Sequence, residues 1–137
     1  MSFDVFLTAF RFGEEVPVDT DALEAALARE GIAGENATVE TADGGSADVL
    51  VDTDGASFLI ERLTPELSRL LFAVASETRL VTLPADGTPA ALVVDAAQTD
   101  ELPEDLRDET SIVSSPAAMH TLLESARERR NEIHGAR

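Results

Sequence analysis

The chain has 137 residues, of which 44% are hydrophobic, and this composition predicts one globular domain with its own core. It carries 27 acidic residues against ten arginines and no lysine, and the formal net charge of −17 argues against DNA, RNA and anionic membranes as partners. Because there is no cysteine, disulfides and thiolate chemistry are excluded, and the apolar runs are far shorter than the roughly 20 residues that span a membrane.

The start of the chain has no basic leader segment, and Asp4 interrupts its apolar run, so we expect no signal peptide and a cytoplasmic protein. Arginine as the sole basic residue type is typical of a GC-rich bacterial genome or of a salt-loving organism. The acidity therefore has a background explanation as well as a functional one.

The first predicted element is a strand over residues 4–12. Its side chains are apolar on both faces, with Phe6 and Phe10 on one face and Val5 and Leu7 on the other. A pattern of this kind is typical of a central strand that is covered on both sides of the sheet. We therefore expect Phe6 to lie in the core.

A helix and a three-strand meander are predicted next. The helix spans residues 20–30 and can be capped by Asp19, Thr20 or Asp21. Asp21 with Glu24 fits a capping box, and Gly31 fits a terminator. Turn sequences that contain Asp-Gly separate the three strands of the meander. These strands span residues 37–41, 47–51 and 57–61.

The second half of the chain predicts two helices and three short strands. Thr64 and Pro65 begin a helix that runs to residue 77, with an apolar stripe at helical spacing. The later elements are strands over residues 79–83, 91–95 and 111–114, and a last helix that begins at Ser115 and Pro116. We expect this last helix to fray over residues 127–137.

Together these elements predict a fold of the α+β (α/β) class. The whole chain, residues 1–137, is expected to form a single globular domain. It would contain a mixed sheet of about six to seven strands with an N-terminal β-α unit, the meander and three helices.

Histidine and serine residues give no catalytic pattern. His120 and His134 are 14 residues apart, which places them about 21 Å apart along one helix, so they cannot share a metal ion. His120 is expected to be a half-buried helix residue. Without a Gly-x-Ser-x-Gly motif, a Ser-His-Asp arrangement is improbable. We expect no catalytic residue and no cofactor.

Two carboxylate positions need separate consideration. Asp52-Thr53-Asp54-Gly55, followed by Glu61, resembles the second half of a calcium loop, but Leu50 falls on the first ligand position. A hairpin turn explains the same residues, so we expect no metal site. Asp4 opens the first strand, and we expect it to lie in solvent at the strand end, with a buried carboxylate site as the alternative.

Charge is unevenly distributed along the chain. Residues 95–109 hold seven acids and one base, Arg107, and we expect a solvated loop with one helical turn at residues 103–106. Residues 127–137 invert the sign, with four arginines against two glutamates. The candidate partner-binding residues are the acids Asp100, Glu101, Glu104, Asp105, Asp108 and Glu109.

Two short segments, Met1-Ser2-Phe3-Asp4-Val5-Phe6-Leu7 and Thr64-Pro65-Glu66-Leu67, resemble small uncharacterised bacterial proteins, commonly actinobacterial, of no assigned activity. They cover about a tenth of the chain, and the resemblance implies no catalytic residues. In size and charge the chain is similar to immunity proteins, which bind and block a toxin.

Three functional interpretations follow from the sequence. The first is a non-enzymatic acidic protein-binding domain, of which an immunity-type inhibitor of a basic partner is one form, because an acidic surface speeds encounter with a cationic one. The second is a small-molecule-binding or hydrolytic domain with a carboxylate-based site. The third is a self-associating structural subunit.

Overall fold

The computed structural model describes residues 3–32, 36–84 and 91–135. Within these ranges the chain has the predicted α+β fold, a mixed sheet with helices. The first half contains β1 (Phe3–Arg11), β2 (Glu14–Val16), α1 (Thr20–Arg29), β3 (Asn36–Glu40), β4 (Ser46–Asp52) and β5 (Gly55–Arg62). The second half contains α2 (Pro65–Thr78), β6 (Val81–Pro84), β7 (Ala91–Val93), the 3-10 helix η1 (Ala96–Glu101), α3 (Glu104–Arg107), β8 (Thr110–Ile112) and α4 (Pro116–Gly135).

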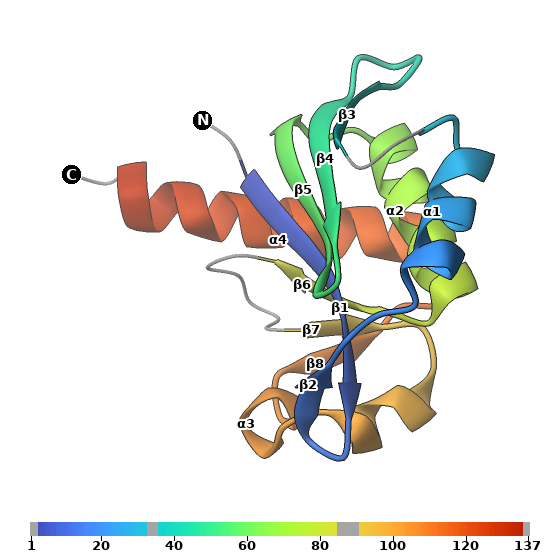
Figure 1. Ribbon diagram of the computed structural model, residues 1–137. Helices are drawn as coiled ribbons and strands as arrows, with labels where there is room; N and C mark the ends of the chain where they lie inside the picture. The colour runs from blue at the N-terminus through green and yellow to red at the C-terminus, as the bar shows by residue number, and fades with distance from the viewer. Residues whose placement is uncertain (1–2, 33–35, 85–90, 136–137) are drawn as a thin grey trace.

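Strand β1 lies in the middle of the sheet, as predicted (Figure 1). The described strands follow the order β3-β4-β5-β1-β6-β7-β8, and β2 pairs with the end of β1. Neighbouring strands are antiparallel except β7 and β8, which are parallel. The predicted meander is confirmed as β3, β4 and β5, whereas the short strand β2 was not predicted.

Local sequence signals explain where the two best-defined helices begin. In α2, the Thr64 hydroxyl accepts a hydrogen bond from the backbone N–H of Leu67, and Pro65 occupies the first helical position, where its missing N–H costs nothing. In α1, the Asp19 carboxylate accepts from the N–H of Ala22. Both caps satisfy backbone donors that the helix itself leaves unpaired.

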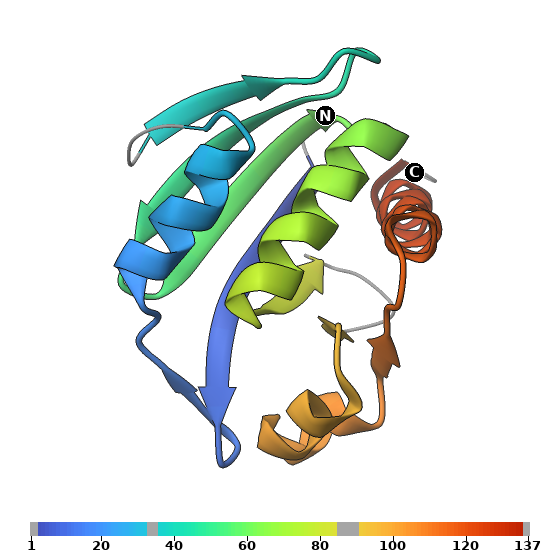
Figure 2. The same ribbon diagram turned by 90° about the vertical axis from the view of Figure 1, so that its right-hand side faces the viewer.

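Helices α1, α2 and α4 all cover the same face of the sheet, and α2 lies between the other two (Figure 2). The main core fills the space between this helical layer and the strands. Its largest fully buried side chains include Phe58, Leu7, Leu67, Leu71 and Leu123. Leu71 therefore lies in the core, as the apolar stripe of its helix indicates.

The opposite face of the sheet is only partly covered. At one end, η1 and α3 close a second, smaller cluster in which Leu102 is fully buried against Val81 and Val93. The rest of this face has no helix over it among the described residues, and Phe6 is 37% exposed there. The prediction that β1 is covered on both sides along its length is therefore wrong, because strand periodicity cannot tell which face a helix covers.

The acidic segment also differs from the sequence-based prediction. The predicted helical turn at residues 103–106 is confirmed as α3, but η1 was not predicted, and the buried Leu102 holds residues 95–109 on the sheet, so they are not a solvated loop. At the C-terminus, helical geometry continues to Gly135, beyond residue 127 where fraying was expected to begin. Within the described ranges, no helix combines the length and apolarity needed to cross a membrane.

Candidate functional site

Residues 95–109, which we call the acidic cap, form a compact ordered surface over the second cluster. Leu102 is fully buried in this cluster and Leu106 packs against it from α3. The Asp95 and Gln98 side chains form a capping box at the start of η1. The cap is therefore attached to the sheet by apolar packing at its centre and by hydrogen bonds at its start.

The predicted partner-binding acids all lie on this cap, but they are not equivalent. Exposed carboxylates are carried by Asp100, Glu104, Asp105, Asp108 and Glu109. Glu101 is half-buried, and its Oε2 accepts a hydrogen bond of 2.7 Å from the backbone N–H of Phe12. Glu101 therefore attaches the cap to the turn between β1 and β2, whereas the other five are available at the surface.

Arg107, the one base in this segment, is engaged by the cap itself. Its Nε donates to the carbonyl oxygen of Leu102 at 2.9 Å, and its Nη2 donates to that of Asp100 at 3.1 Å. The guanidinium thus links two backbone carbonyl groups of the cap by hydrogen bonds. Its position stabilises the local fold, and among the described residues the neighbouring exposed carboxylates form no ion pair.

Asp95 is held in place differently from the exposed acids. Its carboxylate accepts from the backbone N–H of Ala97 at 3.0 Å and from Arg79 Nη2 at 2.5 Å. The hydrogen bond from Ala97, followed by the bond from Arg79, lowers the pKa of Asp95 below its ordinary value. Asp95 is therefore a structural anion of the cap.

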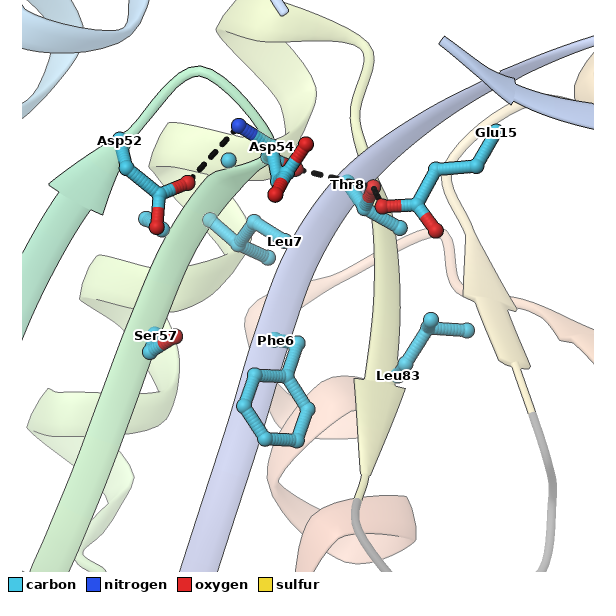
Figure 3. Close-up of a pocket in the computed structure, with 10 residues that line it drawn as sticks. Phe6, Leu7, Thr8, Glu15, Asp52, Asp54, Ser57 and Leu83 are labelled. Atoms are coloured by element: carbon cyan, nitrogen blue, oxygen red, sulfur yellow. Dashed lines mark hydrogen bonds between the residues drawn. The ribbon is translucent and has the colours of Figure 1, made fainter. Parts of the chain in front are cut away.

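A hollow of about 340 Å³ lies on the helix-free side of the sheet (Figure 3). Phe6 and Leu83 form its apolar part, and Glu15, Asp52 and Asp54 lie around its polar end. The hydroxyl of Thr8 lies 3.2 Å from Glu15 Oε1 and 3.0 Å from the carbonyl oxygen of Asp54. The volume of the hollow is at the lower end of the range of small-ligand pockets.

The segment with the calcium-loop resemblance forms the turn at the edge of this hollow. Strand β4 ends at Asp52 and β5 begins at Gly55, which confirms the hairpin interpretation. Asp52 Oδ1 accepts from the backbone N–H of Asp54 at 2.7 Å, so this carboxylate shapes the turn. Across the described residues there is no group of three or more metal-ligating side chains.

Sequence reasoning missed a polar contact between α2 and α4. Ser68 Oγ lies 2.8 Å from His120 Nδ1, and His120 Nε2 lies 3.9 Å from Glu124 Oε1. These three residue types are those of a catalytic triad, but Ser68 is fully buried, so no substrate reaches its hydroxyl. The contact joins the two helices. A serine within the apolar stripe of α2 is the sequence signal that points to it.

The remaining candidates are dispersed. His120 is half-buried, as predicted, and neither it nor Asp4 lines the hollow. Asp4 is half-buried on the helix-free side, not in solvent as expected, and its Oδ1 has no hydrogen-bond partner within the described chain. The side chain of His134 lies outside the described residues.

Comparison with known proteins adds no assignment: no family model, no curated protein and no solved structure matches this chain.

Proposed function

We propose that this protein is a non-enzymatic binding domain that recognises a basic partner protein through the acidic cap. The observation that carries the proposal is the set of five exposed carboxylates on one ordered scaffold whose arginine is engaged by backbone carbonyl groups. A cationic surface is attracted to this cap, because its five exposed carboxylates outnumber the single guanidinium of Arg107.

Two physical effects favour such a role. An ordered surface loses little conformational entropy on association, so its charges contribute to affinity at a lower cost than those of a flexible loop. Exposed charges of one sign also steer diffusional encounter and raise the association rate at low ionic strength. An immunity-type inhibitor, which covers the cationic groove of a toxin nuclease, is one form of this proposal.

The two alternatives have weaker support. A small-molecule-binding or hydrolytic domain with a carboxylate-based site would use the hollow, but two of its carboxylates are already engaged there: Asp52 accepts from the backbone N–H of Asp54, and Glu15 from the hydroxyl of Thr8. A self-associating subunit would place two chains of net charge −17 against each other, which costs electrostatic free energy. Binding to a partner protein of opposite charge needs no such site and is favoured by electrostatic attraction.

The test compares three forms of the protein as bait for proteins of its source organism at low salt. The cap variant carries Asp100→Asn, Glu104→Gln, Asp105→Asn and Asp108→Asn, and leaves Glu101 intact because it anchors the cap. The matched control removes the same charge from exposed acids outside the cap: Asp21→Asn, Glu24→Gln, Glu61→Gln and Glu128→Gln.

We expect the unchanged protein and the control to recover the same basic protein, and the cap variant to lose it. With the purified partner, the cap variant should slow association more than it speeds dissociation, because exposed rim charges act mainly on the on-rate. Equal recovery by all three forms, or recovery of no basic protein, would contradict the proposed function.

A further inference from the structure

The helix-free part of the sheet carries a row of four side chains across four neighbouring strands, and three of the four are apolar. Cross-strand pairing aligns Leu50 of β4 with Ser57 of β5, Ser57 with Phe6 of β1, and Phe6 with Leu83 of β6. Paired residues in antiparallel strands point to the same side of the sheet. We call this line, Leu50-Ser57-Phe6-Leu83, the apolar row.

The apolar row is open at the surface. Leu50 is 43% exposed and Phe6 is 37% exposed, while Leu83 is partly buried because it also packs against the cluster beneath the acidic cap. An antiparallel sheet that faces water usually carries polar side chains on that face. In Figure 3, the helices lie behind the strands, and the ring of Phe6 lies on the near side between β5 and β6.

Acidic residues border the apolar row on both sides. On one side, Asp48 and Asp4 flank Leu59 in the next line of cross-strand partners. On the other side, Glu15, Asp52 and Asp54 surround the polar end of the hollow. The surface is therefore an apolar strip between two lines of negative charge.

Asp4 adds a second reason to expect positive charge beside this surface. Its Oδ1 is buried from solvent and has no hydrogen-bond partner within the described part of the chain. A carboxylate oxygen in this state carries a desolvation cost, which positive charge at the adjacent surface would reduce by electrostatic attraction. The unsatisfied oxygen lies on the same side of the sheet as the apolar row, because Asp4 and Phe6 are two residues apart in one strand.

We propose that this strip docks a basic amphipathic helix of the partner protein. A helix with a narrow apolar stripe would cover Leu50, Phe6 and Leu83, and arginine or lysine residues on both sides of its stripe would meet the two lines of acids. Four adjacent strands span about 14 Å, which matches about nine residues of helix. Such a helix would cover this side of the sheet as α1, α2 and α4 cover the other.

Charge decides between this occupant and a second copy of the chain. Two copies packed through the apolar row would bring their lines of acids together, and like charges at an interface oppose association. A basic helix brings opposite charges to the same positions. The inference rests on the proposed function for the charge of the partner, but it concerns a surface that is distinct from the cap.

The test uses three synthetic helical peptides and amide chemical-shift mapping by NMR on the full chain. The first peptide has a leucine stripe flanked by arginines. The second keeps the arginines and replaces the leucines by glutamine, and the third keeps the leucines and replaces the arginines by glutamate. We expect the first to shift amides of β4, β5, β1 and β6 and to bind at least about fivefold more tightly than the second. The third should not bind.

Substitutions within and outside the row complete the test. Phe6→Thr should weaken binding of the first peptide at least about fivefold, as truncation of an aromatic anchor does. Leu50→Thr provides a second variant if Phe6→Thr lowers the melting temperature. Ile112→Thr is the matched control, because Ile112 is an exposed apolar residue of β8 outside the row.

Each contrary outcome has a distinct meaning. Shifts confined to the acidic cap, with unchanged affinity in the Phe6→Thr and Leu50→Thr variants, would overturn the docking surface and leave the proposed function standing. No shift with either arginine peptide would contradict both. A dimer in sedimentation experiments that Phe6→Thr converts to a monomer would show that a second copy occupies the strip, and this would also overturn the proposal.

Discussion

Gly55 lies so close to Leu7 that a Cβ atom on Gly55 would overlap the backbone carbonyl oxygen of Leu7. This is where the hairpin between β4 and β5 meets the central strand β1, and Gly55 has a φ of +134°, which side-chain-bearing residues rarely adopt. The identity of this residue is therefore set by the packing of two backbones as well as by the turn.

We expect Gly55→Ala to destabilise the protein by about 3 kcal/mol or more, because the overlap forces β5 or β1 to move. Chemical denaturation measures this loss. Gly31→Ala is the control: φ is +84° there, but no atom lies within 4 Å of the added Cβ, so the cost should be about 1 kcal/mol. Equal losses at the two sites would show that β1 and the hairpin are not in close contact.

Leu102 anchors the acidic cap, and we expect Leu102→Ala to cost about 2–5 kcal/mol as a cavity in the second cluster. Leu50→Ala, on the exposed side of the sheet, should change stability by less than about 1 kcal/mol. Thermal and urea unfolding of the two variants would compare them. A small effect at Leu102 would mean that the cap is not held by its buried leucine.

Residues Leu102 and Phe6 also show where sequence reasoning reached its limit. Leu102 and Leu106 are the two leucines within an acidic run, so composition indicates solvent, yet η1 and α3 fold Leu102 onto the sheet. Phe6 alternates correctly for a central strand, but periodicity gives the two faces of a strand and not the elements that cover them. Both errors concern tertiary packing, which a local sequence pattern does not determine.

Local sequence signals predicted turns and helix starts correctly, because the interactions that form these features lie between residues close together in the chain. The Asp54-Gly55 turn and the Thr64-Pro65 helix start lie where the sequence predicts them. The contact between Ser68 and His120 joins positions 52 residues apart and was missed. The six cap acids were selected by charge alone, and their role in binding stays a prediction. The separate structural role of Glu101 depends on its bond to Phe12 and required the structure.

The Ser68–His120 contact predicts a structural effect and no reactivity. Ser68→Ala should destabilise the protein by about 1 kcal/mol, because His120 Nδ1 loses its partner between α2 and α4. Ser125→Ala, an exposed serine of α4, should change stability by less than about 0.5 kcal/mol. A fluorophosphonate probe should leave Ser68 unlabelled, since its side chain is fully buried. Stoichiometric labelling of Ser68, detected by mass spectrometry, would revive a hydrolytic function.

Asp43 predicts how stability changes in acid, because it joins the β3–β4 turn to the start of α2. Its Oδ1 accepts from the hydroxyls of Thr41 at 2.6 Å and Thr64 at 2.7 Å, and its Oδ2 accepts from the backbone N–H of Glu66 at 3.1 Å. These bonds, first that from Thr41 and then that from Thr64, lower the pKa of Asp43 from its ordinary value of 3.8 to about 2.

Because the folded state holds the ionised form, Asp43 contributes stability that is fully present above pH 3.8 and is lost as the pH falls through about 2. We therefore expect Asp43→Asn to be less stable than the unchanged protein near pH 6, and the difference to shrink towards zero as the pH falls to about 2. Urea unfolding at a series of pH values measures this convergence. The control, Asp21→Asn, removes an equal charge from an exposed position in the first turn of α1 and reports the effect of lower net charge alone. The contrary result is a difference in the free energy of unfolding between Asp43→Asn and the unchanged protein that stays constant across the whole pH range. That result would mean that the Asp43 carboxylate does not hold the turn to α2 by ionic hydrogen bonds.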